Sequence, residues 1–202
     1  MRVFLCDVGN IPQDVIKKAV QAIPRERIPK EGARADVVAA RVVGTLLAHY
    51  VIKQISPETV CEKWLTAENG KPYIENCPVH FSISHAGEIV AVALSENSPV
   101  GVDVERVRPM REGFAARYFN DADQALIRTA EDPDEALIRF WTAKEAVGKY
   151  LGTGLGKNIP TIDTKEAATT VFERNDARFA LSIAPKREFP LFEWMDFEHL
   201  MP

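Results

Sequence analysis

Apolar positions divide the 202-residue chain into two successive series of helices and strands. In the first series, the apolar run Val3–Val8 predicts a buried strand, and a helical pattern follows over Pro12–Ile23. Apolar residues then recur at helical spacing over Ala33–Lys53, which predicts a long, mostly buried helix. A second short helix is expected over Ser56–Leu65, because a serine cap precedes a proline suited to the first helical position.

A turn and three short strands follow. Asn69-Gly70 ahead of Lys71-Pro72 predicts the turn, since Asn-Gly favours positive φ and the residue before a proline avoids the helical region. Alternating or continuous apolar runs then predict three strands of a meander: Val79–Ser84, Ile89–Leu94 and Val100–Val107.

The second series repeats this order of helices followed by strands. Helices are expected over Phe114–Phe119, Ala122–Ala130 and Asp134–Tyr150, and strands over Thr170–Glu173, Arg178–Ser182 and Phe192–Phe197. The chain therefore predicts an α+β fold of two similar-sized α/β halves, residues 1–98 and 99–202.

Composition limits the kinds of partner. Hydrophobic residues make up 46% of the chain and charged residues 27%, which is ordinary for a soluble globular protein. The formal net charge of −4 argues against a nucleic-acid partner. Any anion site must therefore be a local basic cluster on an acidic body.

The chain is also expected to be cytoplasmic and not to associate with a membrane. Its longest mostly apolar run, Val37–Ile52, is interrupted by Arg41 and His49 and is shorter than a membrane span. The N-terminus has the pattern of a strand and not of a secretory signal. None of the cysteines has CxxC spacing, which fits a reducing compartment; they are Cys6, Cys61 and Cys77.

Two carboxylates stand two residues apart in the predicted strand Val100–Val107. Because residues i and i+2 share a face of a strand, Asp103 and Glu105 project together while Val102 and Val104 point to the core. Like charges on one face repel unless a cation or basic group lies between them. Taken alone, the pair is more typical of a solvated strand face, with Arg106 and Arg108 nearby.

Glu145 and Lys149 lie four residues apart on one stripe of the predicted helix Asp134–Tyr150. They could be an ordinary surface ion pair. If the stripe faces Asp103 and Glu105, three carboxylates form an oxygen site suited to Mg²⁺, with an ammonium beside it. The glycine-rich stretch 151–157, LGTGLGK, closes this helix and lacks phosphate-loop spacing, so we expect it to end the helix.

Four motifs follow one another along the chain: NGKPYI, FSISHAG, PVGVDVERV and RFWTAKEAVGKYLGTGLG. In this order and spacing they resemble the 4′-phosphopantetheinyl transferase superfamily, in its Sfp-type branch. The last two match the paired signature G-(V/I)-D-(V/I)-E and (F/W)-x-x-K-E-(A/S)-x-x-K. The matched motifs cover about Gly70–Gly156. One position departs from many members: Ala86 stands where they have a serine after Ser-His.

The resemblance implies an enzyme, a Mg²⁺-dependent holo-carrier-protein synthase. Such an enzyme transfers the 4′-phosphopantetheine moiety of coenzyme A to a serine of an apo acyl or peptidyl carrier protein and releases 3′,5′-ADP. A monomer is implied, with its halves in a pseudo-dimeric arrangement and the active site between them. Residues 1–98 would bind the coenzyme A nucleotide, and residues 99–202 would carry the metal and catalytic groups. Fatty-acid, polyketide and nonribosomal-peptide carriers all present such a serine, so the pathway stays open.

The resemblance also implies roles for single residues. Asp103, Glu105 and Glu145 would hold Mg²⁺. Glu145 would also take the serine proton, and Lys149 would pair with the pyrophosphate. The remaining contacts to coenzyme A would come from Arg25, Arg41, Lys71, Pro72, Ser84 and His85. Solvated surface charge is an equally good reading of Arg25 and Arg27.

Two other functions fit parts of the sequence. A non-catalytic module that binds coenzyme A or a carrier would be expected to lack an acidic ligand or the lysine, and this chain has all four residues. A different Mg²⁺ enzyme, such as a phosphohydrolase, leaves GKP and SISH unexplained. The segment Arg106–Tyr118 could dock an acidic carrier protein or be an amphipathic connector.

Overall fold

The computed structural model describes residues 1–59, 61, 63–154, 159–186 and 189–201. They form two compact units, Met1–Val100 with Pro190–Pro202, and Gly101–Phe189. Each unit packs helices against a small, mainly antiparallel sheet. The predicted α+β class is confirmed.

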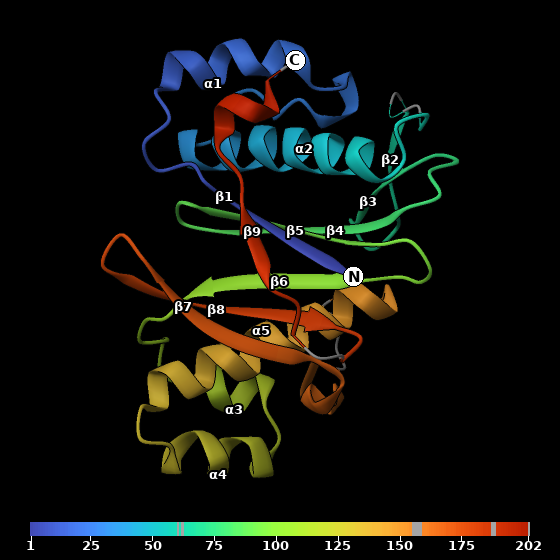
Figure 1. Ribbon diagram of the computed structural model, residues 1–202. Coiled ribbons are helices and arrows are strands. Elements are labelled where there is room, and N and C mark those ends of the chain that lie inside the picture. Colours follow the sequence, from blue (N-terminus) through green and yellow to red (C-terminus); the bar gives the residue numbers. More distant parts are fainter. Residues whose placement is uncertain (60, 62, 155–158, 187–188, 202) are drawn as a thin grey trace. The chain divides into compact units, whose positions relative to one another are not determined.

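The first unit is built on a four-stranded sheet in the order β4-β5-β1-β9 (Figure 1). The strands are β1 (Arg2–Asp7), β4 (His80–Ala86), β5 (Ile89–Ser95) and β9 (Phe192–Trp194). β5 is antiparallel to both β1 and β4, whereas β9 is parallel to β1. A two-stranded hairpin, β2 (Trp64–Thr66) and β3 (Pro72–Ile74), encloses the predicted turn at Gly70, whose φ is +86°.

Helices cover this sheet on the side where α2 lies in Figure 1. They are α1 (Gln13–Ala19), α2 (Ala35–Ile55) and the 3₁₀ turns η1 (Val20–Ala22), η2 (Arg25–Arg27) and η5 (Phe197–Leu200). α2 is long and apolar enough to span a membrane by length and composition alone, but 56% of its most apolar window is buried in the fold. It packs against β5, β4 and α1, as the core helix of a globular unit does.

The second unit has a three-stranded antiparallel sheet in the order β6-β8-β7. Its strands are β6 (Gly101–Arg106), β7 (Ala168–Arg174) and β8 (Ala177–Ala184). Its helices are α3 (Phe114–Tyr118), α4 (Asp121–Thr129) and α5 (Pro133–Leu151), with 3₁₀ turns η3 (Ile159–Thr161) and η4 (Thr164–Glu166). α5 lies along β6 and β8, and α4 packs on α5.

Three predictions about elements are wrong. No helix forms in the described part of Ser56–Leu65: the Ser56 hydroxyl bonds the Glu58 carboxylate at 2.6 Å, and Trp64 pairs with Ile74 in a strand. The three-strand meander breaks after β5, because β1 occupies the second edge of β5 while β6 pairs with β8. The C-terminal strand, expected in the second half, pairs with β1 of the first unit.

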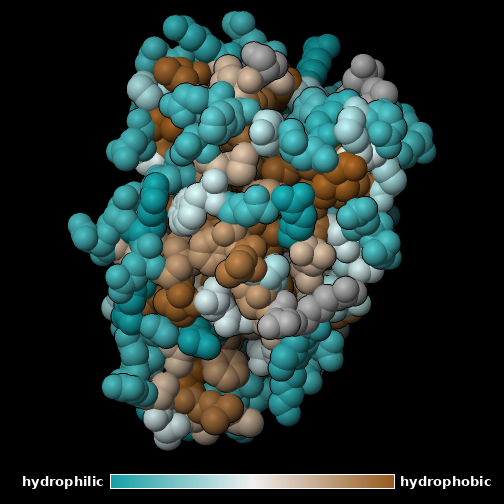
Figure 2. All heavy atoms as spheres, viewed as in Figure 1, coloured by the Kyte–Doolittle hydropathy of each residue, from teal (hydrophilic) through white to brown (hydrophobic). Residues whose placement is uncertain are grey.

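Charged and polar residues cover much of the face shown in Figure 2, with smaller hydrophobic patches among them. This agrees with a chain in which 27% of residues are charged.

Candidate functional site

β6 divides its side chains between two environments. Val102 and Val104 are at most 1% exposed, as strand alternation predicts. Asp103 points to the other face and is only 4% exposed, and Glu105 is half-buried. Interpreting Asp103 as part of a solvated strand face is therefore wrong, since helix α5 lies over β6.

The glycine of the GVDVE motif allows this close packing. A Cβ atom at Gly101 would lie 1.9 Å from the carbonyl oxygen of Ala146 and 2.7 Å from the backbone nitrogen of Tyr150. Both atoms belong to α5, so the strand and helix backbones approach where any side chain would clash. The approach brings the stripe of Glu145 and Lys149 to the strand that carries Asp103.

Lys149 joins the helix to the strand directly. Its ammonium donates to Asp103 Oδ1 at 2.8 Å and to the carbonyl oxygen of Val102 at 3.1 Å. The Lys149 side chain is 25% exposed and that of Asp103 5%. Lys149 is therefore not part of an ordinary surface ion pair, because its charge offsets that of a buried carboxylate.

The other two carboxyl groups are destabilised as anions. Burial and the Asp103 charge raise the pKa of Glu105 to about 7, although Arg108, Lys149 and a hydrogen bond from the Trp141 side chain oppose the rise. Burial and the Asp103 charge likewise raise the pKa of Glu145 to about 7, with Lys149 opposing. The three carboxylates thus repel one another, and a nearby cation would stabilise their charged forms.

The donor chemistry of this cluster fits a hard divalent cation such as Mg²⁺, which prefers carboxylate oxygens. Among the residues that the structure describes, no three His, Cys, Asp or Glu side chains converge closely enough to hold an ion as they stand. The fit is therefore one of donor type and charge. Burial and the charge of Asp103 oppose the ionisation of Glu105 and Glu145, and a cation beside these groups would favour their charged forms.

Lys144 has a structural role that the sequence analysis missed. It precedes Glu145, yet its side chain is fully buried and points away to the loop after α5. Its ammonium donates to the carbonyl oxygens of Ile159, Pro160 and Ile162 at 3.0–3.3 Å and lies 3.1 Å from Asp123 Oδ2. A lysine on the buried side of an amphipathic helix was the available signal, because such a charge needs partners.

The end of α5 agrees with the prediction for its glycine-rich stretch. Gly152 has φ +71° and closes the helix, and the amides of Thr153 and Gly154 donate to the Gly148 carbonyl. This is a helix stop of the left-handed type. Residues 155–158 of the stretch lie outside the described residues.

A basic cluster occurs in the first unit. Arg27 Nε donates to Thr45 Oγ1 at 3.2 Å, its guanidinium stacks over the Trp64 ring at 5.2 Å, and Thr45 Oγ1 bonds the Arg41 carbonyl at 2.7 Å. Burial and the nearby Arg41 charge lower the pKa of Arg27 to about 10. Of the arginines in the loop before α2, Arg27 is the one held beside Arg41; Arg25 is exposed.

The other predicted coenzyme A contacts lie on separate elements of the first unit. Ser84 is buried and His85 is exposed near the end of β4. Pro72 begins β3, opposite Thr66. The Lys71 ammonium donates to the Val100 carbonyl at 2.7 Å.

The segment after β6 combines exposed arginines with packed aromatic rings. The Phe114 ring lies 4.9 Å from that of Trp141 and 4.7 Å from that of Tyr118, centroid to centroid. Arg106 at the end of β6 is exposed, and so are the three arginines of the segment: Arg108, Arg111 and Arg117. The aromatic residues therefore anchor the segment to α5, and the charged ones face solvent.

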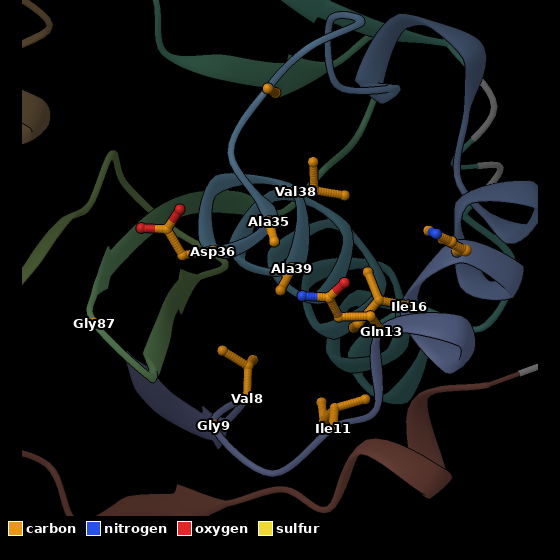
Figure 3. A pocket seen from close by; sticks show the side chains of 12 residues that line it. Val8, Gly9, Ile11, Gln13, Ile16, Ala35, Asp36, Val38, Ala39 and Gly87 are labelled. Carbon is orange, nitrogen blue, oxygen red and sulfur yellow. The ribbon is translucent and has the colours of Figure 1, made fainter.

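A cavity of about 430 Å³ lies in the first unit, between α1, the start of α2 and the turn at Gly87 (Figure 3). Its lining is mostly apolar and includes Val8, Ile11 and Val38, with Asp36 at the rim. None of the predicted site residues lines it.

Comparison with known proteins adds a family to this geometry. The family model described as the 4′-phosphopantetheinyl transferase superfamily matches residues 99–192. The chain is 31% identical over 175 residues to the 4′-phosphopantetheinyl transferase psf-1 of Bacillus pumilus, covering 82% of this chain and 75% of that protein. The chain belongs to the 4′-phosphopantetheinyl transferase superfamily.

Other members of the superfamily match over different lengths. The transferase AcpT of Salmonella typhimurium is 26% identical over 196 residues, covering 94% of this chain and 92% of its own. The transferase Sfp of Bacillus subtilis is 34% identical over 129 residues, 61% of this chain and 57% of its own. A crystal structure of Thermotoga maritima holo-acyl-carrier-protein synthase is 26% identical and covers 44% of this chain and 63% of its own, with a TM-score of 0.33. The family model and the psf-1 relative confirm the resemblance based on four motifs.

Proposed function

We propose that the protein transfers the 4′-phosphopantetheine moiety of coenzyme A to a serine of an apo acyl or peptidyl carrier protein and releases 3′,5′-ADP. The observation that carries the proposal is the cluster formed by Asp103, Glu105, Glu145 and Lys149 where α5 lies on β6. Phosphoryl transfer needs alignment, charge neutralisation and removal of a proton from the nucleophile, and this cluster has groups for each.

Asp103, Glu105 and Glu145 would hold Mg²⁺ through their carboxylate oxygens. When bound, the ion would neutralise charge on the pyrophosphate and on the leaving oxygen. Glu145 would also accept the proton from the serine Oγ as a general base. Lys149, already beside Asp103, would donate to a pyrophosphate oxygen and hold it for attack.

The first unit would supply the contacts to the nucleotide. A phosphate dianion between Arg27 and Arg41 would relieve the repulsion between two guanidinium groups, one of them partly buried. We therefore assign the 3′-phosphate to Arg27 and Arg41, and the predicted Arg25, which is exposed, is the alternative that the variants below test. Lys71, Pro72, Ser84 and His85 remain the proposed contacts to the rest of the nucleotide. A cytoplasmic monomer fits these substrates.

The test of the function is direct. Incubating the protein with coenzyme A, Mg²⁺ and an apo carrier protein should add the mass of one phosphopantetheine to the carrier. Asp103→Ala and Glu145→Ala should each abolish the transfer in a folded protein, and Lys149→Ala should lower kcat. Binding of coenzyme A without turnover would instead indicate a binding module, and release of inorganic phosphate a phosphohydrolase. A panel of apo carriers would identify the pathway.

The nucleotide contacts can be tested with a matched pair of arginines. Arg27→Ala should raise KM for coenzyme A by about tenfold or more, because a charge-assisted bond to a phosphate contributes about 1.5–3 kcal/mol. The same change should have little effect on 3′-dephospho-coenzyme A. Arg25→Ala, which removes an exposed charge two residues before Arg27 in the same 3₁₀ turn, is the control. If Arg25→Ala has the larger effect, the 3′-phosphate belongs to Arg25.

A further inference from the structure

A chain of three hydroxyl groups, two of them fully buried, crosses the interface between α5 and its sheet. Ser182 Oγ donates to Thr142 Oγ1 at 2.8 Å, and Thr169 Oγ1 and Ser182 Oγ lie 2.7 Å apart. Thr142 and Ser182 are both 0% exposed. Burying a hydroxyl costs free energy unless it is hydrogen-bonded, so residues packed here for volume alone would be apolar.

The donors in this chain can be assigned. Thr142 Oγ1 donates its one proton to the helix carbonyls of Ile138 and Arg139, both at 3.1 Å. It therefore accepts from Ser182, whose proton is then used, and Thr169 must be the donor to Ser182. The chain runs in one direction from β7 through β8 to α5, and each of the three hydroxyl protons has a defined acceptor.

The chain lies beside the carboxylate cluster. Ser182 is the register partner of Asp103 across β8 and β6, so their side chains emerge on the same face of the sheet. Thr142 lies three residues before Glu145 and seven before Lys149, on the same stripe of α5. The Ser182–Thr142 bond and the Lys149–Asp103 pair are thus two polar contacts along one stripe, about two helical turns apart.

We propose that Thr142 and Ser182 are positioning residues, which set the rotation of α5 on the sheet and hence the place of Glu145 relative to Asp103 and Glu105. The inference rests on the proposed function of that cluster. Apolar packing is non-directional and leaves small rotations of a helix inexpensive. A directional hydroxyl bond at one point and an ion pair at another hold the stripe in a single orientation.

Two substitutions at Thr142 separate the role of its hydroxyl from that of its shape. Thr142→Val keeps the shape and removes the hydroxyl, and Thr142→Ser keeps the hydroxyl. We expect Thr142→Val to lower kcat by about tenfold or more, since small misplacements in an active site have effects of this size. It should also weaken Mg²⁺ binding several-fold by calorimetry, with KM for the carrier unchanged. Thr142→Ser should restore both. Thr170→Val, on the same strand as Thr169 but outside the chain of hydroxyls, is the control and should match the wild type.

The double variant Thr142→Val/Ser182→Ala guards against misfolding. It removes both partners of the buried Ser182–Thr142 bond, and the Thr169 hydroxyl, which is partly exposed, can bond water instead of Ser182. The protein should therefore keep its urea midpoint while kcat and Mg²⁺ affinity stay reduced. Equal behaviour of Thr142→Ser and Thr142→Val, or wild-type values for both quantities in the folded double variant, would overturn the positioning role. A wild-type protein that binds Mg²⁺ but transfers nothing would instead overturn the proposed function, and the Mg²⁺ titrations would still test the positioning.

Discussion

At the scale of single residues, the carboxyl groups of Glu105 and Glu145 make stability depend on pH. Both have a pKa near 7 in the folded chain against 4.5 for a free glutamate. The folded state therefore binds more protons between these two values, and the free energy of unfolding falls as pH rises from about 4.5 to 7. The cluster therefore lowers the stability of the metal-free protein at neutral pH, and a cation that binds there would raise it.

Glu145→Gln should remove part of this pH dependence. In buffer that contains a metal chelator, the free energy of unfolding of the variant at pH 8 should exceed that of the wild type by on the order of 1 kcal/mol. This difference should vanish near pH 4.5. Urea unfolding across this range measures it. Glu131→Gln, an exposed residue, is the control. Adding Mg²⁺ at pH 8 should stabilise the wild type more than Glu145→Gln; equal stabilisation would contradict a shared site.

Lys144 is a buried charge that stabilises the fold, in contrast to Glu105 and Glu145. Its buried ammonium satisfies three carbonyl oxygens and faces Asp123, whose side chain is 14% exposed. Lys144→Met should lower the free energy of unfolding by about 3–5 kcal/mol, because it leaves an uncompensated carboxylate and bare carbonyls. Lys165→Met, at an exposed site, should change it little. Chemical denaturation of the two variants decides whether Lys144 is structural; near-equal midpoints would show that it is not.

At the scale of elements, the site depends on how closely α5 can lie on β6. Alternation along β6 and the i,i+4 spacing on α5 predict which side chains share a face, and both expectations hold in the structure. The spacing of residues within each element does not predict how closely α5 and β6 pack. Their contact requires Gly101 under the helix backbone and hydroxyl and ionic links at fixed points along α5.

Gly101→Ala tests this contact. The new methyl group would meet the Ala146 carbonyl, a backbone atom that cannot turn aside, so α5 must move away from β6. Overpacking of this kind costs about 1–3 kcal/mol or more. We expect reduced stability by urea unfolding and loss of transfer in whatever protein remains folded. Wild-type stability and activity together would mean that the strand and helix are farther apart than the structure shows.

At the scale of the whole molecule, the last residues of the chain return to the first unit after the sequence of the second unit has ended. β9 pairs with β1, and Phe197 and Leu200 belong to the core of the first unit. The boundary after Val100 lies close to the change at 98–99 expected from the sequence. The return of the last thirteen residues was not expected, because a short strand pattern does not specify its partner.

A chain ending at Phe189 tests this topology. It should lose protection from hydrogen exchange in β1 and β5, since an edge strand and two core side chains are missing, while β8 should keep its protection. Leu191→Ala, at a site 94% exposed, should leave exchange unchanged. Loss confined to β7 and β8 would place the C-terminal segment with the second unit.

Periodicity alone predicted nearly every long element, because burial of one face of a helix or strand is written into the spacing of apolar residues. It also predicted which of Asp103, Glu105, Glu145 and Lys149 share a face. The hairpin in place of the helix at Ser56–Leu65, the partner of β6 and the partners of the Lys144 ammonium were decided only by tertiary structure. Each of these depends on which segments far apart in sequence compete for one strand edge or one buried carbonyl, and local spacing carries no information on that competition.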